Sequence, residues 1–109
     1  MRAAALVALL LAGGPAASQS ARPADIVPAL REAADVYLRQ TARTKTALVR
    51  QHAFLHCALD VLLRSDLPDE VLRRAAADLR ANRATPEIEA RDDLVAETER
   101  VCPTTGLPR

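Results

Sequence analysis

Glycine and aromatic residues are scarce in this chain. Its 109 residues include three glycines, one tyrosine, one phenylalanine and no tryptophan. The sequence also lacks the alternating β-branched and aromatic residues that favour strands. It contains no glycine-rich loop of the kind that holds a phosphate group. These absences predict an all-α fold and give no support to a phosphate-binding loop.

An excess of charge of either sign is also absent. Fifteen lysines and arginines stand against 14 acidic residues, which gives a formal net charge of +1. Nucleic-acid-binding domains carry a clear basic excess, and electrostatic binding to a membrane surface also needs one. We therefore expect neither a nucleic-acid partner nor stable membrane insertion. Arginine supplies every basic residue except Lys45, and this bias, with abundant alanine, is typical of a GC-rich bacterial genome.

The longest apolar run lies at the start of the sequence. Arg2 precedes the run Ala3–Ala12, and a Gly-Gly-Pro break leads from it into small residues. The run has about half of the ~20 residues that a membrane-spanning helix needs. This order is typical of a cleavable signal peptide, with the cut after Ser18 or, alternatively, after Ala17. We therefore expect an exported protein, either periplasmic or secreted.

Export would leave a chain with room for one domain. We expect residues 1–18 to be the signal peptide, 19–24 a disordered leader, 25–103 a helical domain and 104–109 a flexible tail. The sequence shows no repeat, no low-complexity segment and no linker between domains.

The chain contains two cysteines, Cys57 and Cys102, and an exported protein meets oxidising conditions. We expect them to form a disulfide, because two cysteines allow one pairing. Closing a loop of about 46 residues stabilises a fold by roughly 4 kcal/mol in the chain-entropy model. The alternative is that both thiols stay free or bind a metal ion.

Helix-start signals divide the domain into up to four helices. The first is predicted to begin between Asp25 and Pro28, and the second to span about Lys45–Arg64. The threonines of the segment 41–46 weaken helix propensity and can cap a new helix. We expect a turn near Thr44, with one long continuous helix as the alternative.

Two further helices begin with proline in the first turn. The segment Ser65–Glu70 predicts a helix that ends near Asn82. Thr85 as N-cap and Pro86 at the first position predict a fourth helix, which Pro103 ends. Its expected buried stripe consists of Ile88, Val95 and Cys102.

The second helix is the most hydrophobic part of the expected domain. Its main apolar sector consists of Leu48, His52, Leu55, Leu59, Leu62 and Leu63. A second apolar flank predicts neighbours on two sides. The sequence therefore predicts a compact antiparallel bundle of three or four helices with this helix at its centre. Leu48, Leu55 and Leu62 have heptad spacing, so a homodimer seam is a weaker alternative.

His52 and His56 lie one helical turn apart, which is the spacing of helical metal sites. Ala53 replaces the glutamate of the zinc-protease motif, and no c-type haem motif is present. A third ligand would have to come from Asp60 or from another helix. We expect His52 to be a core histidine bonded to a carbonyl or hydroxyl, His56 to be a boundary residue, and no metal or other cofactor.

No set of residues suits nucleophilic catalysis. Ser65 is interpreted as a helix cap and Ser20 lies in the leader, and neither has a histidine at a motif spacing. We therefore expect a protein that is not an enzyme.

Opposite charges gather in two segments. Arg39, Arg43, Lys45 and Arg50 form a basic group without acids, whereas Glu87–Glu99 is mostly acidic. Two solvated helix faces that attract one another would explain this pattern, and a docking patch for a partner is the sharper interpretation.

These observations favour an exported, non-enzymatic helical protein that binds another protein. An inhibitor, an immunity-type protein or an accessory subunit of an envelope complex would fit. The alternative hypothesis is a small metal or haem carrier that uses His52 and His56.

Overall fold

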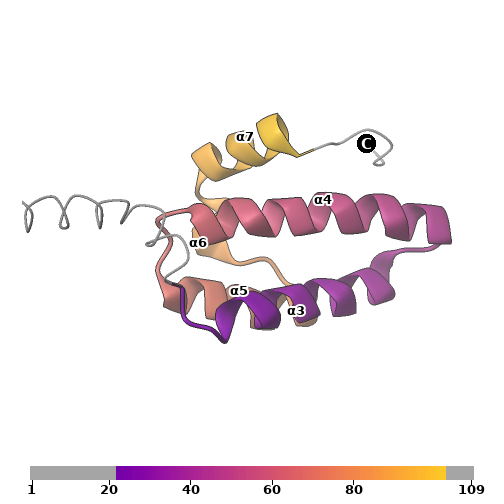
Figure 1. Ribbon diagram of the computed structural model, residues 1–109, viewed down its shortest axis with the longest axis horizontal. Coiled ribbons are helices and arrows are strands. Elements are labelled where there is room, and N and C mark those ends of the chain that lie inside the picture. The colour runs from indigo at the N-terminus through magenta and orange to yellow at the C-terminus, as the bar shows by residue number, and fades with distance from the viewer. Residues whose placement is uncertain (1–21, 103–109) are drawn as a thin grey trace, which may run out of the picture.

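A computed structural model describes residues 22–102 of the chain (Figure 1). Within this range five helices and no strand are present, which confirms the all-α class for the described part. The helices are α3 (Ile26–Thr41), α4 (Lys45–Arg64), α5 (Asp69–Arg80), α6 (Pro86–Glu89) and α7 (Asp92–Val101). The predicted signal peptide (1–18), most of the leader (19–24) and the tail (104–109) lie outside the described residues.

The four longer helices pack in the order α5, α3, α4, α7. Figure 1 shows α4 between α7 on one side and the pair α3 and α5 on the other. The predicted position of α4 between two neighbours is therefore confirmed. Helix α5 packs mainly on α3, whereas α7 packs on α4. The two helices therefore leave part of the α4 surface between them uncovered.

The predicted turn near Thr44 is present between α3 and α4. Ala42 is extended, with a ψ of 130°, and Thr44 caps α4 by accepting a hydrogen bond from the backbone N–H of Ala47 at 3.0 Å. The alternative of one continuous helix is wrong. A threonine cap is enough to start a new helix here without glycine or proline.

Helix α5 starts and ends close to the predicted positions, although Pro68, expected in the first turn, is its N-cap. Pro68 precedes it, and Asp69 and Glu70 lie in the first turn, where the helix dipole favours acids. Asn82 ends the region with a φ of 56°, a left-handed conformation that asparagine tolerates better than most residues.

The predicted fourth helix is two helices. Helix α6 ends at Glu89, and α7 begins at Asp92 after a break at Arg91. The Arg91 guanidinium binds Asp93 at 2.8 Å and Asp66 at 2.9 Å, which ties the break to the loop after α4. The change in helix direction leaves Val95 46% exposed, so it does not lie on one buried stripe with Ile88 and Cys102.

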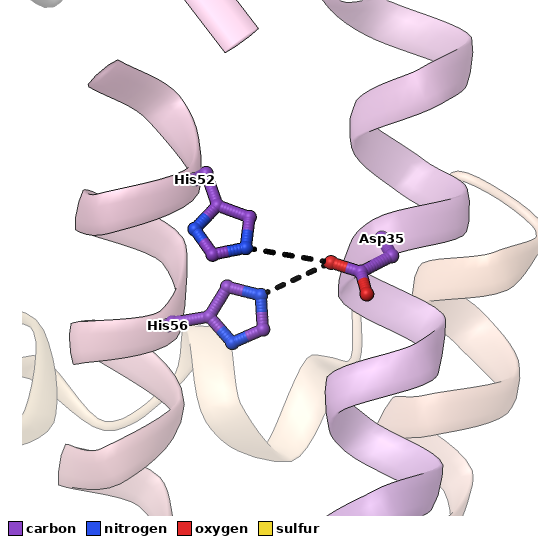
Figure 2. Close-up of side chains that lie close together, drawn as sticks. All are labelled: Asp35, His52 and His56. Atoms are coloured by element: carbon purple, nitrogen blue, oxygen red, sulfur yellow. Dashed lines mark hydrogen bonds and ion pairs between the residues drawn. The ribbon is translucent and has the colours of Figure 1, made fainter. Parts of the chain in front are cut away.

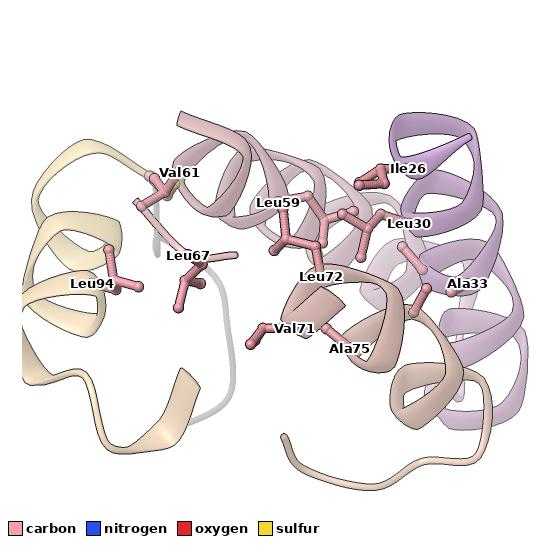
Figure 3. Packing of buried hydrophobic residues seen from close by; sticks show 13 residues of the cluster. Ile26, Leu30, Ala33, Leu59, Val61, Leu67, Val71, Leu72, Ala75 and Leu94 are labelled. Atoms are coloured by element: carbon pink, nitrogen blue, oxygen red, sulfur yellow. The ribbon is translucent and has the colours of Figure 1, made fainter. Parts of the chain in front are cut away.

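The core lies between α3, α5 and the C-terminal half of α4. Leu30 of α3, Leu59 of α4 and Leu72 of α5 belong to one cluster (Figure 3). Its buried members are Ile26, Leu30, Ala33, Ala34, Leu59, Val61, Leu67, Val71, Leu72, Ala75, Ala76, Leu94 and Cys102. No residue of α4 before Leu59 is fully buried, because α5 ends beside Glu32 and leaves the far half of the α3–α4 hairpin uncovered.

The expected disulfide between Cys57 and Cys102 is confirmed. The two Cα atoms lie 5.7 Å apart, and the bond joins the end of α7 to the middle of α4. Cys102 is buried and Cys57 is half-buried. The alternative of free or metal-binding thiols is wrong.

Candidate functional site

Asp35 of α3 faces the two histidines of α4 across the hairpin (Figure 2). The Nε2 atom of His56 lies 3.2 Å from Oδ1 of Asp35, and the Nε2 atom of His52 lies 3.7 Å from the same oxygen. The two imidazole rings are 4.1 Å apart between centroids. Three potential metal-ligating atoms therefore converge on one point, each within 4.8 Å of the others.

His52 is not the core histidine that the sequence predicts. Its side chain is 54% exposed, and its described polar neighbour is a carboxylate rather than a carbonyl or hydroxyl. The reason is the short α5, which leaves this turn of α4 with α3 as its neighbour. Asp35 is 46% exposed and His56 is 17% exposed, so the cluster lies at the edge of the hairpin.

The contact with Arg31 selects the tautomer of the neutral His56 ring. Its Nη1 atom lies 3.1 Å from Nδ1 of His56 and donates to the backbone carbonyl of that residue at the same distance. A guanidinium can only donate, so Nδ1 accepts and the neutral ring carries its proton on Nε2, which donates to Asp35. Asp60, one expected source of a third ligand, instead binds Nη2 of Arg31 at 2.5 Å.

An apolar groove runs along the outer side of α4. One cavity of about 230 Å³ is lined mainly by Phe54, Ala58, Leu62, Ile88, Leu94 and Val95. A second cavity shares Ala58, Leu62 and Ile88 with it and extends toward α5. The groove exists because α5 and α7 flank α4 without meeting, and the segment of α6 forms its far wall.

The groove continues toward the α3–α4 turn. A third cavity shares Phe54 and Leu55 with the other two and is also lined by Tyr37, Thr41 and Gln51. We use the name apolar groove for these three neighbouring cavities, which share lining residues. They follow α4 from Gln51 to Leu62.

Three residues of the predicted basic group lie close to the α3–α4 turn in the sequence. Arg39, Arg43 and Lys45 are exposed on either side of the α3–α4 turn, and we call them the basic end. Arg50, the fourth residue of that group, is exposed further along α4. The first turn of α4 contains no acid, so its positive dipole end adds to the charge of the basic end.

The acidic segment pairs with arginines outside the basic group. Glu87 binds Arg74 of α5, and Glu97 binds Arg100 at 2.8 Å. The Arg74 guanidinium holds the pKa of Glu87 below its usual value, and Arg91 acts in the same way on Asp93. These acids therefore have partners that do not involve the basic end.

The serine of the described chain has a structural role. The Ser65 hydroxyl donates to the carbonyl of Leu62 at 2.5 Å and accepts from the N–H of Leu67 at 3.2 Å. Both bonds stabilise the chain where α4 ends, and Ser65 is the C-cap of that helix. It does not cap the start of the next helix as expected, because the N-cap of α5 is Pro68.

Comparison with protein-family models, with curated protein sequences and with solved structures gives no significant match. Among the described helices, none is long and apolar enough to cross a membrane.

Sequence reasoning missed Asp35 and Arg31 as neighbours of the histidines. Both lie on α3, four residues apart, so they share one face of that helix. The available signal was that these polar residues share one helical face. The sequence does not show which residues of α4 that face meets, because the register between α3 and α4 is determined by tertiary packing.

Proposed function

We propose that this chain is an exported, non-enzymatic protein that binds an amphipathic helix of a partner protein. The helix would lie in the apolar groove, with acidic residues of the partner at the basic end. The observation that carries this proposal is an apolar groove whose third cavity reaches Thr41, in the chain segment that also holds the exposed residues of the basic end.

The groove has the chemistry of a helix-binding surface. Exposed apolar surface in a small protein costs solubility, so a contiguous groove favours a partner. Val95 is 46% exposed beside Leu94 and Ile88, and Phe54 and Leu62 are half-buried opposite them. Grooves of this kind take residues spaced by three and four along an amphipathic helix.

The positive charge of the basic end favours a partner helix that carries acidic residues. Arg39, Arg43 and Lys45 are exposed and lie within four positions in the sequence of Thr41, which lines the end of the groove. Opposite charges increase the rate of encounter and fix the orientation of a partner. The occupant would therefore carry glutamates or aspartates at the end that meets the α3–α4 turn.

The Cys57–Cys102 disulfide supports the exported location, because disulfides persist in oxidising compartments. It also fixes the wall formed by α7 against the middle of α4. A wall held in place lowers the entropy cost of binding.

Two synthetic amphipathic peptides with the same apolar face test this proposal. One carries glutamates and the other lysines at the end that should meet the turn, and binding is measured by fluorescence anisotropy at low salt. We expect the glutamate peptide to bind at least about tenfold more tightly, because three positive charges attract it. V95E should abolish binding, and V27E serves as the control because Val27 is 38% exposed on α3, outside the groove.

Three results would contradict the proposal: no binding of either peptide, equal affinity for both, or equal effects of V95E and V27E. Sedimentation of the protein alone adds a further test. A dimer that V95E disrupts and V27E leaves intact would assign the groove to a second copy of this chain, and the proposed acidic helix would be wrong.

A further inference from the structure

We propose that Asp35, His52 and His56 form a binding site for a divalent transition-metal ion of the Zn²⁺ class. The site lies between α3 and α4 and shares no residue with the apolar groove. It goes beyond the proposed binding of a partner helix and does not depend on it.

The distances from Asp35 to the two histidines are close to those of a tetrahedral site. Ligands at 2.0–2.2 Å from Zn²⁺ in tetrahedral geometry lie about 3.3–3.6 Å from one another. The Nε2 atoms of His56 and His52 lie 3.2 and 3.7 Å from Oδ1 of Asp35. Two of the three ligand separations are therefore close to the tetrahedral values, and the third, between nitrogens of the two histidines, is within 4.8 Å.

The ligand types select the class of ion. Imidazole nitrogens suit Zn²⁺, Cu²⁺ and Ni²⁺, whereas Ca²⁺ and Mg²⁺ prefer sites made of oxygen atoms. Two histidines and one carboxylate leave the fourth tetrahedral position for water or for a side chain from another molecule. The same donor set makes this site a better fit to a metal ion than to haem, which takes axial ligands on its two faces and needs an apolar pocket.

The site is accessible and partly preorganised. His52 and Asp35 are about half exposed, so an ion can reach them from solvent. His56 is 17% exposed, and its Nε2 atom already faces Asp35. One helical turn separates the two histidines, which fixes their spacing in the absence of metal.

Arg31 opposes the metal in the observed arrangement. Metal bound at Nε2 of His56 places the ring proton on Nδ1, where it would face the N–H of Arg31. Metal-bound histidines normally donate this second N–H to an acceptor. Arg31 must therefore leave Nδ1 when the ion binds, while it can keep its bonds to Asp60 and to the backbone carbonyl.

The conflict between Arg31 and the proton that metal binding places on Nδ1 of His56 provides a specific test. A damaged fold would lower the affinity for Zn²⁺, whereas removal of Arg31 should raise it. In R31Q the amide oxygen can accept from Nδ1, so R31Q should raise the affinity for Zn²⁺, whereas the ligand variants should lower it. Outer-shell changes typically alter metal affinity by about 10–100-fold. We expect a gain near the lower end of that range.

Calorimetric titration of the untagged, disulfide-bonded protein with zinc chloride at pH 7.5 measures these effects. We expect one Zn²⁺ per chain, at least about tenfold weaker binding in D35N, H52A and H56A, and no change in D92N, an exposed acid on α7. Circular dichroism of each variant checks the fold. His52 and Asp35 are exposed enough that H52A and D35N remain informative if H56A does not fold.

The proposal is wrong if the wild-type protein takes up no Zn²⁺ at millimolar concentration, or if D35N and H52A bind it as the wild type does. Replacing Zn²⁺ by Co²⁺ adds a spectroscopic readout, because the visible absorption of Co²⁺ reports a tetrahedral site. An octahedral spectrum that persists in H52A would also overturn the assignment. The glutamate peptide should bind H52A as it binds the wild type. Loss of metal binding and loss of peptide binding can therefore be distinguished.

Discussion

The Arg22 guanidinium lies 2.7 Å from the carboxylate of Asp69, which is 47 residues later in the sequence. It also donates to the backbone carbonyls of Leu63, Ser65 and Leu67, at 3.2, 2.8 and 2.7 Å. One side chain therefore satisfies three carbonyls at and beyond the end of α4, which have no partner within the helix. A cut after Ser18 or Ala17 would keep Arg22 in the mature chain.

We expect R22A to destabilise the protein by about 3 kcal/mol, because charged hydrogen bonds are lost and partly buried carbonyls remain unpaired. The Arg22 side chain is only 12% exposed, so solvent replaces these bonds poorly. Urea denaturation of the disulfide-bonded protein measures the change.

R80A is the matched control, because Arg80 forms an exposed ion pair with Glu32. Such pairs contribute at most about 1 kcal/mol. Equal midpoints for R22A and R80A would show that the network of Arg22 is not a significant source of stability.

The disulfide should hold α7 in place. We expect reduction, or the double variant C57S/C102S, to lower the free energy of unfolding by about 4 kcal/mol in the chain-entropy model. Apart from the bond, α7 is anchored mainly by buried Leu94 and by the ion pairs of Arg91. Hydrogen exchange should therefore become faster in α7 before it does so in α3.

Uniform faster exchange over α3 and α7 would contradict this expectation, because it would indicate a global loss of stability without preferential release of α7. The oxidised wild-type protein under the same conditions provides the reference rates.

The fold was largely predictable where local signals determine it. Thr44, Pro68 and Asn82 mark helix ends through their own side chains or backbone preferences, and the structure places the ends there. The break at Arg91 was missed because one of its partners, Asp66, lies 25 positions earlier. A contact between distant residues leaves no trace in helical periodicity.

The sequence predicts the histidine pair of the candidate metal site but not the third ligand. The spacing of His52 and His56 shows that they share a helical face. The burial of His52 was predicted wrongly, because the hydrophobic sector of α4 is longer than the helix that covers it. Asp35 could be identified only once the register between α3 and α4 was known.

Thr85 should control the ionisation of Asp78. The buried Thr85 hydroxyl donates to Oδ2 of Asp78 at 2.9 Å, and this bond, assisted by Arg83, holds the pKa of Asp78 below its usual value. A carboxyl whose pKa is lower in the folded state stabilises the fold above its unfolded pKa. That contribution is lost as the pH falls through the folded pKa.

We therefore expect T85V to raise the pKa of Asp78 toward its usual value and to weaken the dependence of stability on pH below about pH 5. Carboxyl carbon chemical shifts followed by NMR measure the pKa. T98V is the control, because the hydroxyl of Thr98 donates to the carbonyl of Leu94 rather than to an acid. An unchanged titration of Asp78 in T85V would show that Arg83 and Arg74, without Thr85, account for the lowered pKa.

Reversing the charge of Lys45 should have opposite effects on the stability of α4 and on binding of the proposed partner. It occupies the first turn of α4, where no acid is present and the dipole disfavours a positive charge. We expect K45E to increase the free energy of unfolding by about 0.5–1 kcal/mol at low ionic strength, with a smaller gain in high salt. The same substitution should weaken binding of the glutamate peptide, because it reverses one of the three charges of the basic end.

Urea denaturation and peptide anisotropy measure the two effects, and K45Q should give about half of each. Weaker binding together with lower stability would attribute the effect to a damaged fold, whereas weaker binding by a more stable protein requires a direct role of the basic end.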